Sequence, residues 1–442
     1  MEGTMPTALT IAGSDSVGGA GLQADLKAFE AVGVHGCSVV TCVTSQNTRR
    51  VSSIFPIPPS EVLSQLESVL EDVELDAIKT GMLYAPETVE VVSSRLRRVD
   101  APLVVDPVLA ATTGSSLRAE GFEAALIKRL IPKATLVTPN LHEASALSGL
   151  DVRDEKSVKR AAAVIRGLGA RNVLIKGGHL KGTEAADYLF TENGMTKLTT
   201  PRALVSVHGT GCALASLIAA HLALGNGVVD ATRKSKTMIY KAIIARETVG
   251  KGIPCANPLA VLRGNAEKVS MLEQLEAAGQ ELERILDADL IPEVGSNMGY
   301  ASLAALEPEE VAAFDGRIVR IGHRARRVGC ARFGASKHVA RIVLAAGCHD
   351  PAVRCALNIK YSDNNLDACR KAKLTVSAFD RAREPKGVSS MTWGVHSAIQ
   401  KYGSVPDVIS DRGGVGKEAM IRILGRSPDD VLRKLKRMMS RR

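Results

Sequence analysis

Hydrophobic and polar positions over the first 250 residues form a repeating series of short apolar runs and longer amphipathic stretches. The short runs are apolar throughout, which is typical of strands buried on both faces of a sheet. We expect strands at 8–12, 38–44, 103–105, 135–138 and 172–175. The amphipathic stretches predict helices at 20–31, 60–70, 86–98, 119–130, 155–168, 211–224 and 230–249. This order predicts an α/β unit with a doubly wound, mostly parallel sheet, and ligands at the carboxyl ends of its strands.

A second, shorter series of strands and helices follows after a break. Glycine and proline interrupt the pattern between residues 250 and 264, and the charged helical segment that follows, 267–286, has the composition of a connector. We then expect strands at 317–321, 353–359, 374–377 and 407–409, with helices at 336–346, 366–372, 392–401 and from 428 onward. The predicted organisation is a large domain at 1–262, a helical connector at 263–290 and a smaller α/β domain at 291–442.

The bulk composition agrees with two folded domains. A chain of 442 residues with 45% apolar content exceeds the size at which a single core stops growing. Charged residues of both signs make up 24% of the chain, which excludes a disordered protein. No apolar run is long enough to cross a bilayer, and no cleavable apolar segment opens the chain. We therefore expect a cytoplasmic protein that does not bind membranes.

Cysteine spacing and charge exclude two further classes of site. The eight cysteines contain no Cys-x-x-Cys pair, so a structural zinc site is not expected. The net charge of +10 is concentrated in the second half, but aromatic residues are only 3% of the chain and offer few platforms for stacking bases. A basic pocket for phosphorylated small molecules has the same charge signature. We expect small-molecule substrates and no nucleic acid.

The most informative motif is His208-Gly209-Thr210-Gly211-Cys212, directly before a long apolar helix. Gly209, Thr210 and Gly211 leave backbone amides exposed at the positive end of the helix dipole, which predicts an anion hole for a transferred phosphoryl group. Cys212 lies in the first turn, where the dipole favours its thiolate, and could accept the proton of an attacking hydroxyl. The alternative is a small residue packed beneath the loop, and its position favours the functional role.

Charged and amide side chains follow three of the predicted strands. Asn140 and Glu143 lie three residues apart at a helix start, where Glu143 could hold magnesium through water or could simply cap the helix. Asp106 ends one strand and Lys176 lies at the end of another. A lysine in this position can neutralise nucleotide phosphates. These residues predict a ring of polar groups at one edge of the sheet.

Two further segments could meet a polar substrate. Gly18 to Gly21 leave a bare backbone at a helix start, with Asp25 about one turn later. Gln46 follows the end of a predicted strand, and its amide donates and accepts side by side, as required to read a ring nitrogen beside an amino group. Without context, a tight turn with a solvated Asp25 is an equally acceptable interpretation, and a Gln46 bound to loop backbone would ordinarily be favoured.

The second half carries a basic strand before a helix start. We expect Arg317 and Arg320 to share one face of a strand, with Ser336 as the helix cap and His338 in the first helical turn. Arginines that face a helix N-terminus suit phosphate or diphosphate. A salt-bridged basic surface would have the same spacing.

Over residues 8 to about 258, these motifs resemble the hydroxymethylpyrimidine and phosphomethylpyrimidine kinases of thiamine synthesis. The matching segments are 8–27, 44–48, 138–143, 176–179 and 208–212. The resemblance implies a ribokinase-like fold and two successive phosphorylations, first of the alcohol and then of the monophosphate. It also implies that Gln46, Asp25, Gly13 and Met82 bind the pyrimidine, with Cys212 as the base, Lys176 in catalysis, and Asn140 and Asp106 at the nucleotide.

Residues 291–434 resemble the archaeal-type thiamine-phosphate synthase domain. The matching segments are 291–297, 332–340, 356–362, 377–381 and 406–424. This family joins the pyrimidine diphosphate to a thiazole phosphate, and loss of diphosphate leaves a resonance-stabilised cation. Cationic side chains should therefore hold the leaving group. The resemblance leads us to expect Arg317, Arg320 and His338 in that role, Arg320 and His338 in catalysis, and Asn358 in substrate binding, with Lys360, Asp380 and Asp411 as weaker candidates.

Together the two resemblances predict a bifunctional enzyme of thiamine synthesis that uses ATP and Mg²⁺ and forms a homo-oligomer. The diphosphate made by the first domain would be the electrophile of the second. Two alternatives remain at this point. The first domain could be another ribokinase-like enzyme, such as a pyridoxal kinase, and the second could be a non-catalytic thiamine-phosphate-sensing domain.

Overall fold

The chain folds into two compact units, Met1–Ala260 and Val261–Arg442. The computed structural model describes residues 5–109, 117–178, 180, 182, 184–203, 205–385, 390–414 and 416–442. His179 and Val415, which belong to two of the matching motifs, lie outside these ranges. Within them, no helix has both the length and the apolar character needed to cross a membrane.

The first unit is built on one sheet with strand order β3-β2-β1-β4-β5-β6-β7-β8-β9. Neighbouring strands from β2 to β7 in this order are parallel, whereas β3, β8 and β9 pair antiparallel at the two edges. The strands are β1 (Thr7–Asp15), β2 (His35–Gln46), β3 (Val51–Pro56), β4 (Ala77–Thr80), β5 (Leu103–Val105), β6 (Leu136–Val137), β7 (Asn172–Gly177), β8 (Glu184–Thr191) and β9 (Gly194–Pro201).

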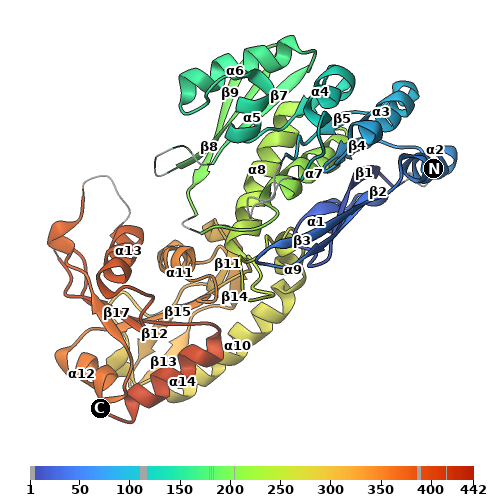
Figure 1. The fold of residues 1–442 in the computed structure, drawn as a ribbon. Helices are drawn as coiled ribbons and strands as arrows, with labels where there is room; N and C mark the ends of the chain where they lie inside the picture. Colours follow the sequence, from blue (N-terminus) through green and yellow to red (C-terminus); the bar gives the residue numbers. More distant parts are fainter. Residues whose placement is uncertain are drawn as a thin grey trace. The chain divides into compact units, whose positions relative to one another are not determined.

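Helices cover both faces of this sheet (Figure 1). The helices are α1 (Gly21–Glu30), α2 (Pro59–Asp72), α3 (Pro86–Arg95), α4 (Phe122–Ala125), α5 (Leu141–Ser148), α6 (Glu155–Gly167), α7 (Thr210–Ala223) and α8 (Val228–Ile244). One core cluster lies under α2, α3 and α6, and a second lies under α1, α7 and α8. Because both faces are covered, the central parallel strands β5 and β6 are apolar and buried throughout.

The predicted strands and helices of this unit are all present, with small shifts at their ends. The sequence pattern missed β4, whose buried Lys79 interrupts the apolar run, and it missed the antiparallel strands β3, β8 and β9. The doubly wound, mostly parallel arrangement is confirmed.

The second unit is a mainly antiparallel sheet between two helix layers. Its strand order is β14-β11-β10-β15-β18-β17-β16, with β12 and β13 as a separate hairpin, and only β16 and β17 pair in parallel. The strands are β10 (Met298–Ala301), β11 (Val311–Phe314), β12 (Ile318–Ile321), β13 (Arg324–Arg327), β14 (Ala331–Phe333), β15 (Cys355–Lys360), β16 (Val376–Ala378), β17 (Val408–Asp411) and β18 (Met420–Gly425).

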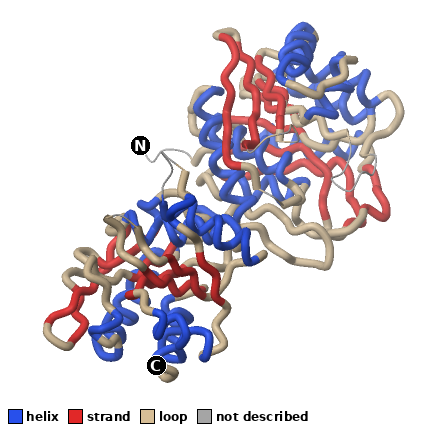
Figure 2. Tube along the Cα trace, turned by 90° about the vertical axis from the view of Figure 1, so that its left-hand side faces the viewer, coloured by secondary structure: helices blue, strands red, loops and turns tan. Residues whose placement is uncertain are grey.

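The helix layers of the second unit lie on opposite sides of its strands (Figure 2). The helices that pack in this unit are α10 (Lys268–Ile285), α11 (Lys337–His349), α12 (Asp363–Lys371), α13 (Ser390–Tyr402) and α14 (Pro428–Met439), and α9 (Ala260–Ala266) begins at the boundary. One core cluster includes residues of α10, α12 and α14, and the other includes residues of α11 and α13.

The helical connector predicted at 263–290 is helical, as α10, but it belongs to the second unit. Met271, Leu275, Ala278 and Leu282 of α10 are buried in the core of the second unit. Their spacing places them along one helical stripe. The charged positions between them gave this segment the composition of a linker, although its apolar stripe is a core face.

Candidate functional site

The first unit contains a cavity of about 1060 Å³ at the carboxyl ends of its strands and the start of α7. Every predicted site residue of this unit except Asp25 lines the cavity: Gly13, Gln46, Met82, Asp106, Asn140, Glu143, Lys176, Gly209, Thr210, Gly211 and Cys212. The strand–helix pattern explains this convergence, because parallel strands end at the same edge of a sheet.

The start of α7 forms a turn without bulky side chains. Gly209 has φ 81°, a left-handed conformation that favours glycine, and a Cβ there would lie 1.7 Å from the carbonyl oxygen of Gly19. Only glycine therefore allows this loop to pack against the Gly18–Gly21 loop. A Cβ at Gly211 would lie 3.2 Å from Nζ of Lys176, so the lysine cation stands beside the helix start. The predicted anion hole and a phosphate-neutralising lysine thus lie together.

The surroundings of Cys212 hold its thiol protonated. Its pKa is raised to about 11, mainly by burial and also by Asp106 and Asp25, against lowering by Lys79 and by the backbone amide of Gly21. The expectation that the helix dipole would favour the thiolate is therefore not met, because desolvation is the larger effect.

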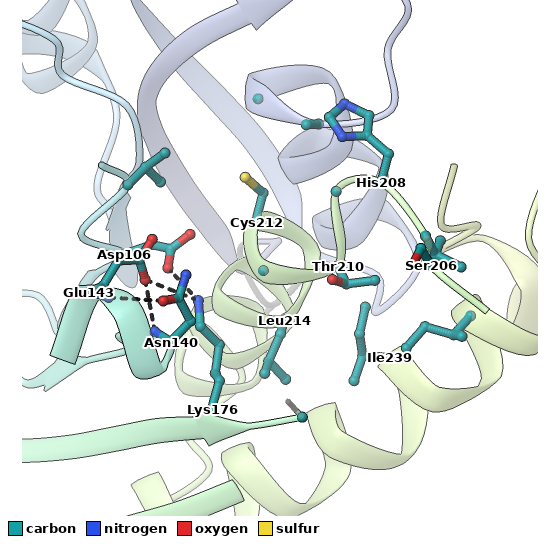
Figure 3. Close-up of a pocket in the computed structure, with 18 of the residues that line it drawn as sticks. Asp106, Asn140, Glu143, Lys176, Ser206, His208, Thr210, Cys212, Leu214 and Ile239 are labelled. Atoms are coloured by element: carbon teal, nitrogen blue, oxygen red, sulfur yellow. Dashed lines mark hydrogen bonds and ion pairs between the residues drawn. The ribbon is translucent and has the colours of Figure 1, made fainter. Parts of the chain in front are cut away.

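Lys176, Asp106 and Glu143 form a charged cluster on one side of the cavity (Figure 3). Nζ of Lys176 lies 2.9 Å from Oδ1 of Asp106 and 3.9 Å from Oε2 of Glu143. Burial would lower the lysine pKa, but the two carboxylates raise it above its usual value. Burial also raises the pKa of Glu143 to about 7, with Lys176 lowering it and Asp106 raising it. The lysine stays charged, while the glutamate can change its protonation state near neutral pH.

Asn140 and Glu143 form a reciprocal capping box at the start of α5. Oδ1 of Asn140 accepts the amide of Glu143 at 2.9 Å, and Oε2 of Glu143 accepts the amide of Asn140 at 2.8 Å. The capping role considered for Glu143 is thus real. One oxygen of the carboxylate serves the cap, and the residue also lines the cavity.

The cluster suits Mg²⁺ held together with phosphates. The described residues contain no group of three or more histidine, cysteine or carboxylate side chains that could enclose a metal ion. Mg²⁺ needs no such cage, since it keeps several waters and takes one or two carboxylates plus substrate phosphates. Asp106 and Glu143 supply two carboxylates beside the start of α7.

Asp25 does not meet the cavity. It is fully buried, and its oxygens accept hydrogen bonds from Thr10 at 2.7 Å, Ser216 at 2.7 Å and Nζ of Lys79 at 2.8 Å. Lys79 lines the cavity in its place, and sequence reasoning missed it because it lies inside an apolar strand. Asp25 therefore supports Lys79, and its predicted contact with a substrate is not formed.

The far end of the cavity is apolar. Leu214 and Ile239 lie there on α7 and α8 (Figure 3), together with Val205 and Ile243. This wall could hold the flat base of a nucleotide, with its phosphates directed toward the start of α7.

The second unit contains a cavity of about 460 Å³, lined by the predicted residues Arg317, His338 and Asn358. The amide of Asn358 is engaged by backbone, accepting from Asn297 at 2.8 Å and donating to Gly295 at 3.1 Å. Arg317 precedes the strand with φ 72°, and its guanidinium donates to the carbonyl of Val294. Helix α11 begins after Ser336, which occupies the cap position without a side-chain hydrogen bond.

The prediction that Arg317 and Arg320 share a strand face is wrong. Residues three apart point to opposite faces of a strand, and only residues two apart share one. Arg320 is exposed on β12 and does not line the cavity. Of the weaker candidates, Lys360 is exposed and Asp380 caps a short 3₁₀ turn by accepting the amide of Ala382.

A buried ion cluster that the sequence did not reveal stands beside this cavity. Nε of Arg381 lies 2.5 Å from Oδ1 of Asp411, and a terminal nitrogen of the fully buried Arg422 lies 2.7 Å from Oδ2. Both guanidiniums also lie over the ring of Phe379. One carboxylate between two guanidiniums leaves a surplus positive charge, and Arg381 lines the cavity. This arrangement favours an anionic ligand.

His338 is neutral in this setting. Burial and the charges of Arg422, Arg317 and Arg381 lower its pKa to about 4, against a smaller raising effect of Asp411. Its Nε2 is buried and makes no hydrogen bond within the described part of the chain. The expectation of a cationic His338 is therefore wrong, although the residue does face the cavity.

Comparison with known families assigns both units. The model of the phosphomethylpyrimidine kinase family matches residues 15–257, and that of the thiamine-phosphate synthase ThiN family matches residues 274–437. The chain is 34% identical to the bifunctional thiamine biosynthesis protein ThiDN of Methanocaldococcus jannaschii, over 97% of each chain. It is 46% identical to the hydroxymethylpyrimidine/phosphomethylpyrimidine kinase of Streptomyces coelicolor, over 57% of this chain and 93% of that protein.

Solved structures agree on the fold of the first unit. The pyridoxal kinase of Staphylococcus aureus in complex with AMP-PCP and pyridoxal matches with a TM-score of 0.55 and 34% identity, over 59% of this chain and 96% of that one. The ADP complex of the Bacillus subtilis pyridoxal kinase matches with a TM-score of 0.55 and 33% identity, over 59% of this chain and 99% of that one. The ribokinase-like fold expected from the motifs is confirmed.

Proposed function

Since this chain belongs to the bifunctional thiamine biosynthesis proteins, with a phosphomethylpyrimidine kinase unit and a thiamine-phosphate synthase unit, we propose that it carries out two consecutive stages of the pathway. The first unit phosphorylates 4-amino-5-hydroxymethyl-2-methylpyrimidine twice with ATP. The second unit joins the resulting diphosphate to thiazole phosphate, which forms thiamine monophosphate and releases diphosphate.

One observation carries the kinase proposal. The amide of Gln46 and the glycine turn at the start of α7 open onto the same cavity, with Cys212 beside the turn. A ring held by Gln46 would present its hydroxymethyl group toward an anion hole and a potential proton acceptor. Binding, phosphoryl transfer and proton removal then share one pocket.

Positioning and charge contribute most of the catalysis in this pocket. Phosphoryl transfer passes through a loose transition state, so held phosphates and nearby cations matter more than the strength of a base. The amides of Gly209 to Gly211 and the cation of Lys176 stabilise charge on the transferred group. Only the thiolate of Cys212 can accept the hydroxyl proton, so the thiol must first release its own proton to solvent.

Asp106 and Glu143 would hold Mg²⁺, the glutamate through water. The ion would neutralise phosphate charge when it enters with the nucleotide. The capping box keeps Glu143 directed at the cavity, and Lys176 balances both carboxylates before the ligand arrives.

The second unit stabilises a leaving anion. Departure of diphosphate from the pyrimidine leaves a cation that the thiazole nitrogen attacks, so the anion must be held as the bond breaks. Arg317, Arg341, Arg381 and Lys417 line the cavity, with Glu418 as a counter-charge. The neutral imidazole of His338 contributes hydrogen bonding without charge.

Two alternatives make different predictions. A pyridoxal kinase would prefer pyridoxal to the pyrimidine alcohol, and the structural neighbours with this specificity share 33 to 35% identity with the chain. A sensing domain would bind thiamine phosphate without condensation. We further propose a cytoplasmic location and a homo-oligomeric state.

A single reconstitution tests the proposal. Pure protein is given ATP, Mg²⁺, the pyrimidine alcohol and thiazole phosphate, and thiamine monophosphate is measured. We expect product only when all four are present. Formation of pyrimidine diphosphate without thiamine monophosphate would support the sensing domain, and faster phosphorylation of pyridoxal would support the pyridoxal kinase.

A further inference from the structure

A short chain of polar contacts ends at the amide of Gln46. Nε2 of His208 lies 2.9 Å from the amide nitrogen of Gln46 and 3.2 Å from Oδ2 of Asp15. All three residues line the kinase cavity, and neither family comparison assigns a role to His208. The donors and acceptors of this chain decide how Gln46 is oriented.

Asp15 is an obligatory acceptor. Its carboxylate accepts the backbone amides of Val17, Gly19 and Ala20 at 3.0, 3.1 and 2.8 Å. Burial raises its pKa, but the hydrogen bonds from His208, Val17 and Ala20 outweigh this effect, so the pKa lies below its usual value. An ionised carboxylate has no proton to give. Nε2 of His208 must therefore carry a hydrogen toward Asp15.

A protonated Nε2 cannot accept a hydrogen bond from an amide NH₂ group. The atom of Gln46 that faces His208 must then be the oxygen. The side-chain amide is therefore rotated by 180° about its last bond, so that its oxygen and nitrogen exchange places. Only the hydrogen-bond network can decide between these two orientations. Thr44 leads independently to the same orientation. The Thr44 hydroxyl donates its one hydrogen to the carbonyl of Ser14 at 2.9 Å. The same hydroxyl lies 3.4 Å from the other end of the Gln46 amide, where it can only accept.

We propose that His208, held by Asp15, is a positioning residue that fixes the polarity of the Gln46 amide and thereby selects a ring with an amino group beside a ring nitrogen. With its oxygen toward His208 and its nitrogen toward Thr44, the amide keeps one lone pair and one N–H for a ligand. An aminopyrimidine edge offers the complementary donor and acceptor. A 4-oxo ring offers the reverse pair. This inference rests on the kinase function proposed above.

The backbone holds His208 firmly enough for this task. Its amide donates to Pro254 at 2.8 Å, and its carbonyl accepts from Ala256 at 3.0 Å. Gly209, next in the chain, is locked against Gly19. The imidazole therefore has a fixed base from which to orient Gln46.

The test compares two substrates. We measure kcat/KM of the full-length protein for 4-amino-5-hydroxymethyl-2-methylpyrimidine and for its 4-oxo analogue. In His208→Leu only the longer contact with Thr44 still orients the amide, so the preference for the amino ring should fall by about 10-fold to 100-fold, the cost of one unmet polar contact. Asp15→Asn lets Nε2 become an acceptor and should shift the preference in the same direction.

Controls separate selection from general damage. His35→Leu, at an exposed position at the start of β2, should leave the preference unchanged. Equal losses for both substrates in His208→Leu and in Asp15→Asn, with the ratio kept, would overturn the proposal. Thr44→Val, which removes the acceptor on the other side of the amide, gives a second measurement if His208→Leu does not fold. Failure of the native protein to phosphorylate the amino substrate would instead overturn the kinase function itself.

Discussion

The thiol of Cys212 and the imidazole of His338 are both held uncharged by their surroundings. Each side chain lies at a helix start, where the sequence alone favours a charged form for one and a phosphate contact for the other. Burial reverses the first expectation, and burial together with neighbouring arginines reverses the charge expected for the second. At the scale of a residue, desolvation decides the protonation state.

We expect Cys212→Ser to lower the rate of pyrimidine phosphorylation by about two to four powers of ten. Serine has the size of cysteine but is a poorer proton acceptor, while the glycine turn is unchanged. The affinity for ATP should therefore stay the same. Steady-state kinetics and calorimetric nucleotide binding check this result, and unchanged turnover would remove Cys212 from the mechanism.

The low pKa of His338 predicts a pH-dependent stability of the second unit. The pKa is about 4 in the folded unit, against 6.5 for an ordinary histidine. Between these values the unfolded chain binds one more proton, so the free energy of unfolding rises with pH and is lost as pH falls from 6.5 toward 4. The contribution is about 3 kcal/mol at most.

Trp393 is the chain's single tryptophan and lies in α13, so its fluorescence reports on the second unit. The free energy of unfolding is measured by urea unfolding between pH 4.5 and 7. It should rise with pH less steeply in His338→Asn than in the native protein. His323→Asn, at an exposed position of the β12–β13 hairpin, serves as the control. The same pH dependence of the free energy of unfolding in all three proteins would contradict the prediction.

At the scale of an element, the capping box at α5 contains Glu143, which both stabilises the helix start and lines the kinase cavity. Asn140→Ala removes one hydrogen bond of the box and should destabilise α5 by about 1 kcal/mol. Amide exchange over residues 141–148 should then become several times faster. Glu143→Gln can still accept the amide of Asn140, so exchange should change little.

Glu143→Gln tests the carboxylate separately from the cap. Loss of its charge should raise the Mg²⁺ concentration for half-maximal kinase rate by about 10-fold or more. A metal titration of the kinase rate measures this effect. An unchanged requirement would restrict Glu143 to its capping role.

Strand β12 and the 3₁₀ turn that follows β16 differ in how they present arginine to the second cavity. Arg381 lines the cavity and is clamped by Asp411, whereas Arg320 on β12 is exposed. Arg381→Ala should lower condensation by about 10²-fold to 10³-fold, the usual effect of losing one donor to developing charge. Arg320→Ala should have little effect. The assay is thiamine monophosphate formation from supplied pyrimidine diphosphate and thiazole phosphate, and equal activity in both variants would contradict the assignment.

At the scale of the whole molecule, each unit has its own core and its own cavity. We expect a fragment of residues 1–260 to keep kinase activity and a fragment of residues 261–442 to keep condensation. A fragment of residues 291–442 lacks α10 and loses burial of Met271, Leu275 and Leu282. Each such side chain contributes about 1.5 to 3 kcal/mol, so the loss approaches the whole stability of a small domain.

Circular dichroism and the two activity assays compare the fragments. A folded, active fragment of residues 291–442 would restore the connector interpretation of 263–290. Inactivity of the fragment of residues 261–442, if it is folded, would show that the synthase depends on the kinase unit.

The sequence by itself determined five of the nine strands that the structure describes in the first unit and their alternation with helices, and with them the edge at which Gln46, Asn140, Lys176 and Cys212 meet. Short apolar runs bounded by turn residues are typical of buried strands, and parallel strands bring their carboxyl ends together. The second unit was harder to predict from the sequence, because its antiparallel strands and the buried stripe of α10 leave weaker hydrophobic patterns along the chain.

Only the tertiary structure decided which charges are partnered. The ion pair between Asp25 and Lys79 joins residues 54 positions apart, and the pair between Asp411 and Arg422 joins residues 11 apart. No local pattern indicates that these residues meet. The same packing turned Arg320 to solvent and kept His338 neutral. Protonation states and ion pairs depend on the sum of neighbours in space, which the order of residues along the chain does not contain.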